Sequence, residues 1–325
     1  MGIFASKFDP ETDLLDLKGK VAVVTGGNAG IGYWTVLGLR RRGAKVYLGA
    51  RSEEKARAAV VQMDVEEGLG EVVIFSIDLE HPSSAKAAAL WIMEREARLD
   101  VLVNNAGRIP SPPYVLTKEG MSITMVTNFL SPFLFTCTIS PLLEAAAKEP
   151  GSDVRVITVS SEMHTLVSNP KYDSIEAFNQ TLGSETSYYG AVKRYGLSKL
   201  AGVLHSQEMQ RRYNAENIPI TCISLHPGRV RTDTAISDVA KLPIAMIGQI
   251  FMRWTFYTPE QGSYTTLFAA ASKTVGEDRE KYKAAWLEPY DKIGRPGPLA
   301  KDEVLANTLW KTSVDILQDV YKIEV

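Results

Sequence analysis

Short apolar runs alternate with helical segments along most of this chain, and this alternation constrains the fold more than any other feature. Runs rich in valine and isoleucine predict strands at about residues 20–27, 44–51, 71–78, 100–107, 154–161 and 218–228. Helical spacing predicts helices at about 30–43, 52–67, 82–99, 118–147 and 188–213. Strands this apolar are buried on both faces, so we expect an α/β fold with a doubly wound parallel sheet and right-handed crossovers.

The domain organisation follows from the same alternation, which continues without a linker from about residue 20 to 272. We therefore expect one domain over 20–272, preceded by an N-terminal extension at 1–19. Residues 273–325 are expected to form a C-terminal extension that packs on the same domain around a final helix at 301–321. The polar segment 162–187 has no clear period and predicts a long loop.

Composition excludes several classes of function. The net charge of −2 provides no basic field for nucleic acid, and the four histidines form no metal-ligand pattern, so we expect neither partner. Two cysteines, Cys137 and Cys222, are too few for a disulfide framework and suit buried thiols in a reducing, cytoplasmic compartment.

We expect no signal peptide and no transmembrane span. The most apolar run, 242–257, is shorter than the ~20 residues a span needs and contains glycine, glutamine and arginine. A peripheral membrane contact stays open as an alternative. Gly2 and Ser6 match an N-myristoylation pattern, for which an ordinary N-terminal tail is the other interpretation.

The segment TGGNAGIG, residues 25–32, lies between the first strand and the first helix. Its glycines Gly26, Gly27, Gly30 and Gly32 permit a tight turn and let backbone N–H groups approach a pyrophosphate closely. The helix N-terminus adds a partial positive charge, which favours an anion. This context predicts a dinucleotide site, although the spacing differs from the common Gly-x-Gly-x-x-Gly pattern.

The end of the second strand indicates which dinucleotide binds. An NAD site usually carries an acid there, but this strand ends in Gly49 and Ala50, and Arg51 follows. A guanidinium at that place suits the 2′-phosphate of NADP, whereas a solvated arginine is the plainer interpretation. Asn28 is a further candidate for the phosphate. Asp78, after the third strand, is placed either to accept from the adenine amino group or to cap a helix.

Six motifs in order resemble the short-chain dehydrogenases/reductases: TGGNAGIG, NNAG at 104–107, Asn128, VSS at 159–161, a Tyr-x-x-x-Lys and HPG at 226–228. Within the family, the segments YGLSKLAGVL, HPGRVRT and TPEQGSYTTLFAA are most similar to the retinol-dehydrogenase and WW-domain-oxidoreductase-like branch. Fungal biosynthetic reductases of the family also look like this chain. The resemblance implies a single-domain Rossmann fold with a sheet of about seven strands.

The resemblance also implies a set of site residues. The implied catalytic residues are Asn128, Ser161, Tyr195 and Lys199. The implied cofactor residues, for NADP(H), are Gly26, Asn28, Gly30, Ile31, Gly32, Arg51, Asp78, Leu79, Asn105, Ala106, Gly107, Tyr195, Lys199, Pro227, Gly228, Val230 and Thr232. His226 is expected to be structural.

The pattern Tyr-x-x-x-Lys occurs twice, as Tyr189 with Lys193 and as Tyr195 with Lys199. A shift of six residues turns a helix by about 600°, so both pairs cannot line one site. The family form is Tyr-x-x-Ser-Lys, which only the second pair matches, through Ser198. We therefore expect Tyr195 and Lys199 to be catalytic, and Tyr189 to pack or to form a wall of the pocket.

These residues suit the reduction of a carbonyl, in which a proton donor must lie within reach of the oxygen. The Lys199 ammonium is expected to favour the phenolate and so to lower the pKa of Tyr195, which starts near ~10. Ser161 would hydrogen-bond the substrate oxygen, with Ser160 the less favoured candidate. The resemblance has Asn128 hold a water beside Lys199, and Thr232 bind the nicotinamide carboxamide.

The substrate side is expected to be formed by 163–187 and by about 233–258, whose apolar, methionine-rich composition suits a hydrophobic small molecule. The predicted function is therefore an NADP(H)-dependent oxidoreductase that acts on a carbonyl or alcohol of a hydrophobic substrate. The alternatives are a double-bond reductase or epimerase with the same site, or a binding protein without catalysis. The sequence leaves open whether the protein is a monomer or a homodimer.

Overall fold

A computed structural model describes residues 8–63, 69–231 and 256–325. In this part of the chain eight strands form one sheet in the order β3-β2-β1-β4-β5-β6-β7-β8. The strands are β1 (Val21–Thr25), β2 (Lys45–Ala50), β3 (Val72–Ser76), β4 (Val101–Asn104), β5 (Val154–Val159), β6 (Ile220–Leu225), β7 (Trp286–Glu288) and β8 (Lys292–Ile293). All pairs are parallel except β7 with β8. The predicted doubly wound α/β fold is confirmed.

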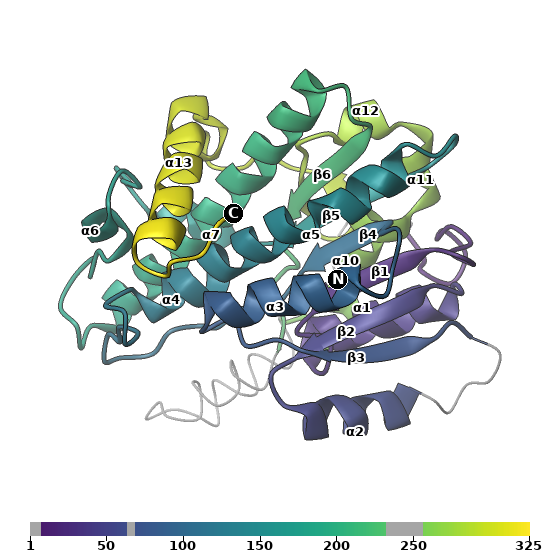
Figure 1. The fold of residues 1–325 in the computed structure, drawn as a ribbon, viewed down its shortest axis with the longest axis horizontal. Coiled ribbons are helices and arrows are strands. Elements are labelled where there is room, and N and C mark those ends of the chain that lie inside the picture. The colour runs from purple at the N-terminus through teal and green to yellow at the C-terminus, as the bar shows by residue number, and fades with distance from the viewer. Residues whose placement is uncertain (1–7, 64–68, 232–255) are drawn as a thin grey trace.

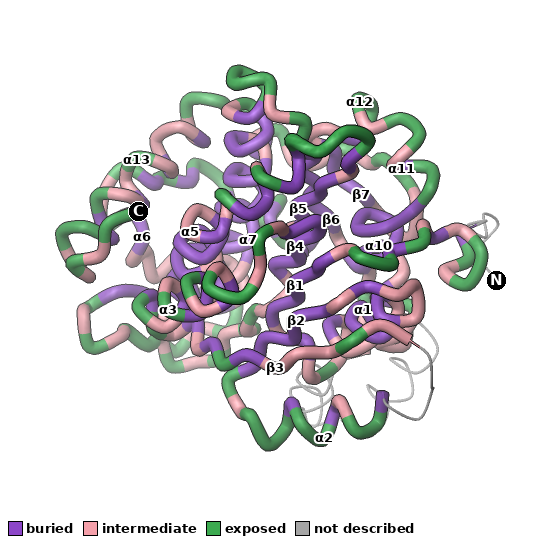
Figure 2. The backbone as a smooth tube through the Cα atoms, turned by 45° about the vertical axis from the view of Figure 1, so that its right-hand side comes forward, coloured by how far each residue is buried: buried purple, intermediate pink, exposed green. Residues whose placement is uncertain are grey.

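Helices cover both faces of this sheet, as Figure 1 shows. One face packs against α1 (Gly30–Arg41), α2 (Glu53–Met63) and α10 (Pro259–Ala271). The other packs against α3 (Pro82–Met93), α5 (Ser131–Ala147) and α7 (Tyr188–Ala215). The strands therefore occupy the buried centre, and the outer side of α2 is exposed (Figure 2).

The residues of β1 show why the strands lie at the centre. All five residues of Val21–Thr25 are buried, with Ala22 and Val24 packed on one helical layer and Val21 and Val23 on the other. Alternate side chains of a strand point to opposite faces, so a continuous apolar run needs two covering layers. From β1 the strands follow outward on one side as β2 and β3, and on the other side as β4, β5 and β6. In doubly wound sheets, ligands bind at the carboxyl ends of the strands at the point where the strand order changes side in this way.

The helix predicted at 118–147 begins five residues later than expected and is not uniform. It consists of α4 (Ile123–Met125), a π-helical turn η1 (Val126–Leu130) and α5. Among the described residues, this helix alone is long and apolar enough to cross a membrane, and 67% of its most apolar window is buried inside the protein. That burial is typical of a core helix.

The segment predicted as a loop at 162–187 contains two short helical turns, the 3₁₀ turn η2 (Glu162–Leu166) and α6 (Ile175–Phe178). Ser161 and Ser174 cap these turns by accepting from the N–H groups of Met163 and Ala177. Capping by serine stabilises a turn that has too few residues to show a hydrophobic period.

Residues after 272 contribute to the same sheet and core. They include α11 (Lys273–Glu277), α12 (Arg279–Tyr282), β7, β8, the 3₁₀ turn η3 (Pro298–Lys301) and α13 (Glu303–Asp319). β7 pairs with β6, and α13 packs on α7, where the Arg212 guanidinium lies 4.0 Å from the centre of the Trp310 ring. The sheet therefore has one strand more than the seven expected, because the two residues of β8 fold back on β7.

Candidate active site

The glycine loop between β1 and α1 forms one wall of a cleft at the carboxyl ends of the strands. Gly26 and Gly30 adopt positive φ angles of 66° and 56°, which disfavour other residues. A Cβ on Gly32 would collide with the Gly26 carbonyl oxygen. Ala29 precedes α1 and has no side-chain oxygen to cap it, so the first N–H groups of the helix face the cleft lined by Ala29, Gly30 and Ile31.

Thr25 and Asn105 hold this loop in place. The Asn105 side-chain amide donates to the Thr25 carbonyl at 2.8 Å, and the Thr25 hydroxyl accepts from the backbone N–H groups of Asn105 and Ala106, both at 3.1 Å. Asn105 was predicted as a cofactor residue; its side chain is engaged with the loop, while the residue still lines the cleft. The role of Thr25 was not foreseen, because it depends on a contact across 80 residues.

Two adjoining clefts share Gly26, Ala106, Gly107 and Ile109 and together form one elongated site. The first, of about 410 Å³, includes the start of α1 and the predicted residues Tyr195, Lys199 and Pro227. The second, of about 440 Å³, includes the predicted residues Asn28, Arg51, Asp78 and Leu79. The predicted nicotinamide and adenosine halves of the site are thus brought together across the sheet edge.

Arg51 shares a carboxylate with a second arginine in the adenosine half. The Glu80 Oε1 atom accepts from Arg51 Nη1 at 3.1 Å and from Arg108 Nη1 at 3.0 Å. Asp78 accepts from the Glu80 backbone N–H at 3.0 Å, so this carboxylate caps the turn after β3. Sequence reasoning missed Glu80 and Arg108, although Arg108 directly follows the NNAG motif.

The two Tyr-x-x-x-Lys pairs of α7 lie in different surroundings. Tyr195 and Lys199 line the first cleft, with the Lys199 ammonium 5.5 Å from the centre of the tyrosine ring and 2.8 Å from the Val159 carbonyl oxygen. The Tyr189 side chain is 64% exposed, and the Lys193 ammonium lies 4.6 Å from its ring centre. The packing expected for Tyr189 is therefore wrong, and the residues that line the two clefts do not include it, so the alternative of a pocket wall is not found among them either.

The two serines at the end of β5 have separate partners. The Ser160 hydroxyl donates to the Lys199 carbonyl at 2.9 Å and so joins β5 to α7. Ser161 is 9% exposed, its hydroxyl accepts from the Met163 N–H at 3.2 Å, and its interaction with the Tyr195 side chain acts to lower the pKa of that phenol. Ser160 lines the first cleft, but its hydroxyl proton is engaged with the Lys199 carbonyl, so Ser161 is the better candidate to bond a substrate oxygen.

Burial governs the protonation of the tyrosine and the lysine. Burial raises the pKa of Tyr195 to about 12, and its hydrogen bond with Ser161 acts in the opposite direction. Burial lowers the pKa of the Lys199 ammonium to about 8. The lowered pKa expected for Tyr195 is thus reversed, because burial penalises the charged forms of both groups more than the attraction between them favours the phenolate. The phenol stays protonated at neutral pH.

Asn128 lies in the π-helical turn and joins two parts of the site. Its Oδ1 accepts from the Arg108 N–H at 2.8 Å, while its Nδ2 donates to the Arg108 carbonyl and to the Ser198 hydroxyl, both at 3.0 Å. A π turn displaces side chains from α-helical register and is frequent at functional sites. Asn128 therefore fastens the chain after β4 to the catalytic helix.

The turn after β6 closes the first cleft at Pro227. Gly228 has a φ of 88°, and a Cβ there would come within 2.5 Å of the Tyr257 ring. Val230 bridges to Tyr257, and Arg231 donates from its N–H to the Tyr257 carbonyl at 2.9 Å. The predicted residue Thr232 and most of the predicted substrate segment 233–258 lie outside the described residues.

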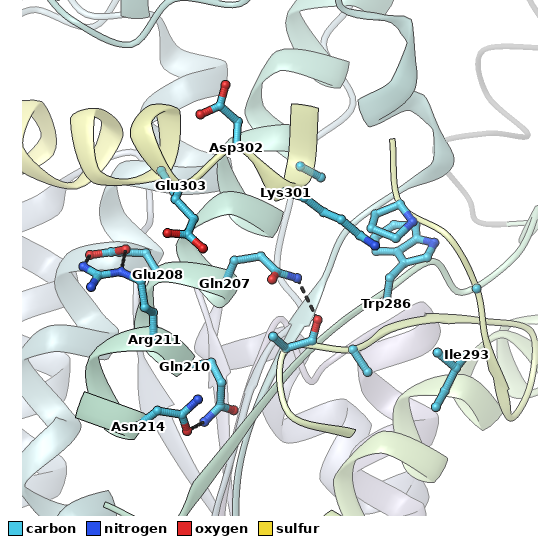
Figure 3. A pocket seen from close by; sticks show the side chains of 16 residues that line it. Gln207, Glu208, Gln210, Arg211, Asn214, Trp286, Ile293, Lys301, Asp302 and Glu303 are labelled. Carbon is cyan, nitrogen blue, oxygen red and sulfur yellow. Dashed lines mark hydrogen bonds and ion pairs between the residues drawn. The ribbon is translucent and has the colours of Figure 1, made fainter. Parts of the chain in front are cut away.

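Another pocket, of about 460 Å³, lies between α7, β7 and α13, away from this cleft (Figure 3). Its polar side chains bind one another: Arg211 donates to Glu208 at 2.7 Å, and Gln210 donates to Asn214 at 3.0 Å. Gln207 donates to the Ala284 carbonyl at 2.7 Å. Groups satisfied in this way offer few bonds to a ligand, so we place the active site at the first cleft.

Titratable side chains elsewhere do not indicate a metal. Within 8–63, 69–231 and 256–325, no group of three or more histidine, cysteine or acidic residues is arranged to hold a metal ion. Cys137 and Cys222 are free thiols, and Cys222 is buried.

Comparison with known proteins gives a consistent family signal. The model of the family described as short chain dehydrogenase matches residues 20–174. A short-chain dehydrogenase/reductase of the fungus Armillaria gallica is 43% identical over 316 residues, which cover 97% of this chain and 98% of that protein.

Solved structures have the same fold. An uncharacterized protein of Mycobacterium paratuberculosis matches with a TM-score of 0.70 and 27% identity, covering 98% of this chain and 99% of its own. The RhlG/NADP active-site complex of Pseudomonas aeruginosa matches with a TM-score of 0.63 and 23% identity, covering 86% of this chain and 97% of its own.

Proposed function

This chain belongs to the short-chain dehydrogenase/reductase family, and from that premise we propose that it is an NADP(H)-dependent oxidoreductase that reduces a carbonyl group of a hydrophobic substrate. The observation that carries the proposal is that Tyr195 and Lys199 line a glycine-rich cleft, while Ser161, which follows the lining residue Ser160, interacts with the Tyr195 side chain. The same residues would catalyse oxidation of the alcohol in the reverse direction.

A nicotinamide cofactor would supply the hydride, and the protein residues would supply the proton and hold the oxygen. The protonated Tyr195 phenol lines the cleft and interacts with Ser161, so both side chains would be available to the same carbonyl oxygen. Ser161 would hydrogen-bond the same oxygen and stabilise the charge that develops on it. Lys199, held on the Val159 carbonyl, would then favour the charged phenolate and assist its reprotonation.

The residues fit a dinucleotide. Gly26 has a positive φ angle that suits a tight turn, and a Cβ on Gly32 would collide with the Gly26 carbonyl, so both glycines support a compact loop of the kind a pyrophosphate can approach closely. The uncapped start of α1 at Gly30 provides N–H donors and positive potential for a pyrophosphate. This phosphate site would lie between the catalytic residues of the first cleft and Arg51 of the second.

The preference for NADP(H) rests on two arginines. Arg51 and Arg108 bring two positive charges to Glu80, so the group of three keeps a net positive charge. A phosphate can accept from both guanidinium groups, whereas a ribose hydroxyl can use only one strong donor. RhlG of Pseudomonas aeruginosa, which shares this fold, was solved as a complex with NADP.

The apolar substrate class is supported by exposed side chains beside the catalytic serine. Ile109, Met163 and Leu166 are 44%, 37% and 44% exposed, and Ile109 lines both clefts. Met163 and Leu166 belong to η2, directly after Ser161. Exposed apolar side chains gain free energy when an apolar ligand covers them, and Ile109 lies in the cleft itself.

Fluorescence titration with NADPH and NADH tests the cofactor assignment. The Arg51→Ala variant should bind NADPH more weakly, while NADH binding stays weak and nearly unchanged. Arg57→Ala is a matched control, since Arg57 is an exposed arginine on α2 that pairs with Glu53. Equal binding of both dinucleotides would contradict the assignment to NADP(H), and binding of neither would favour a protein without catalytic function.

A further inference from the structure

The turn that carries the catalytic serine is held from two sides. On one side Gly196 of α7 lies against the Met163 carbonyl, where a side chain would collide with that oxygen. On the other side His164 reaches Gly297, in the C-terminal part of the chain. The position of Ser161 therefore depends on a segment more than 130 residues away.

His164 makes two hydrogen bonds that fix its protonation. Its Nδ1 lies 2.7 Å from the Ser161 carbonyl oxygen, and its Nε2 lies 2.8 Å from the Gly297 backbone nitrogen. Because the Gly297 N–H can only donate, Nε2 must accept, and the ring proton must be on Nδ1 and point at Ser161. The side chain is 3% exposed, and its ring lies 4.6 Å from the Trp286 ring of β7.

We propose that His164 is a positioning residue, which bridges the Ser161 carbonyl to Gly297 and thereby keeps the Ser161 hydroxyl directed at Tyr195. The proposal rests on the proposed function, because it assigns His164 a part in the same reaction. The imidazole does not touch the reacting atoms in this arrangement. It acts through the backbone of the residue that does.

The bridge has a consequence for pH dependence. A protonated ring would present an N–H at Nε2 to the Gly297 N–H, and two donors cannot bond to each other. Burial lowers the pKa of His164 below its ordinary value, so the bridge is intact at neutral pH and is lost on acidification.

His226 interacts electrostatically with His164, so the charged groups near His226 also affect the acid titration of this turn. Glu162 lies 3.8 Å from His226 Nε2 and 3.3 Å from Arg229 Nε, and Glu288 of β7 acts on His226 as well. A fall in kcat at low pH could therefore arise from several of these groups, and comparison of variants must show which part is due to His164.

Three substitutions separate the two hydrogen bonds of His164, the one from Nδ1 to the Ser161 carbonyl and the one that Nε2 accepts from the Gly297 N–H. His164→Asn keeps an N–H donor near the Nδ1 position, His164→Gln places an acceptor near the Nε2 position, and His164→Leu removes both. His81→Leu is the matched control, since His81 is exposed at the start of α3. For each variant, kcat for reduction of α-tetralone, an apolar ketone, is measured against pH, together with the Kd for NADPH.

We expect His164→Leu to lower kcat about tenfold, which corresponds to the loss of a buried hydrogen bond, while the Kd for NADPH stays within about twofold. His164→Asn keeps the hydrogen bond to the Ser161 carbonyl and should recover most of this loss in kcat, whereas His164→Gln should recover less. Neither variant should show the part of the fall in kcat at low pH that protonation of His164 causes in the wild type. An unchanged kcat in His164→Leu would overturn the proposal, as would an equal loss of NADPH binding. If His164→Leu does not fold, His164→Asn against His164→Gln decides, and equal kcat values would overturn it.

A readout without turnover separates this proposal from the proposed function. The NMR signals of the Ser161 and Gly297 amides should shift in His164→Leu, and the ring nitrogens of the wild type should show a proton on Nδ1. If the wild type binds NADPH but does not reduce α-tetralone, the proposed substrate class fails, and these signals decide the bridge alone. Unshifted amides or a proton on Nε2 would overturn it.

Discussion

Removal of the Arg108 guanidinium should reduce the preference for NADPH over NADH. Arg108 and Arg51 each lie about 3 Å from the same Glu80 oxygen, so their nitrogen atoms are close enough for one phosphate to reach both. The Arg108 backbone is held separately by the Asn128 side chain, so Arg108→Ala should leave the loop in place.

The size of the effect follows from the charges and their exposure. Two unit charges at 4 Å interact by about 4 kcal/mol at an effective dielectric constant of 20. Arg108 is 38% exposed and Arg51 is 69% exposed, so solvent should reduce this to about 1–2 kcal/mol. At about 1.4 kcal/mol per factor of ten, the Kd for NADPH should rise about 5- to 30-fold.

The assay is fluorescence titration of NADPH and NADH at low and high salt. Binding of NADH should change less than about twofold, and the loss for NADPH should shrink as salt screens the charges. Glu80→Gln should act in the opposite direction and tighten NADPH binding, because it removes the negative charge shared by the two arginines. Equal weakening of both dinucleotides in Arg108→Ala, or no change in either, would refute the assignment of this side chain to the 2′-phosphate.

Three further outcomes are expected. Tyr195→Phe should lower turnover at least about 100-fold without weakening NADPH binding, because only the proton donor is lost. Steady-state kinetics and NADPH titration measure the two effects, and full turnover would exclude Tyr195 as the acid. Gly32→Ala should weaken binding of NADPH and NADH alike in the same titration, since its Cβ would collide with the Gly26 carbonyl and distort the loop, and wild-type affinity for both would show that the loop adapts. Burial lowers the pKa of His205 to about 3, so its contribution to stability is complete above about pH 6.5 and is lost as the pH falls towards 3. His205→Phe should therefore flatten the fall in urea midpoint between about pH 7 and about pH 4, and an unchanged slope would place the acid sensitivity elsewhere.

Much of the fold was predictable because its signals are local. The strand at Val21–Thr25 is visible as a run of β-branched residues, and the turn after it as glycines at fixed offsets. The π-helical turn at Val126–Leu130 was not predictable, since it leaves the apolar composition of the helix unchanged. β7 was not placed because three residues are too few to show a strand period.

The candidate site was predictable where a motif has a short sequence signature, as at Tyr195 and Ser161. Contacts between segments that are distant in the chain were not predictable. The link from His164 to Gly297 spans 133 residues, and the meeting of Arg108 with Glu80 spans 28. The pKa of Tyr195 was misjudged for a related reason, since desolvation depends on the whole surrounding fold.

The way Asn128 holds the chain divides this protein into parts that can and cannot be re-engineered separately. Its side-chain amide forms hydrogen bonds with the Arg108 backbone and the Ser198 hydroxyl. None of these bonds involves the Arg108 side chain, which can therefore be substituted without losing them. Exchange of the side chain at position 108 is thus a modular edit that should retune the choice of dinucleotide without loss of rate. A loop graft that replaces residues 105–110 as a block would instead break the hydrogen bonds between the Asn128 amide and the backbone of residue 108. The helix that carries Tyr195 would then be held less firmly through Ser198, so new specificity obtained in that way should come with slower catalysis.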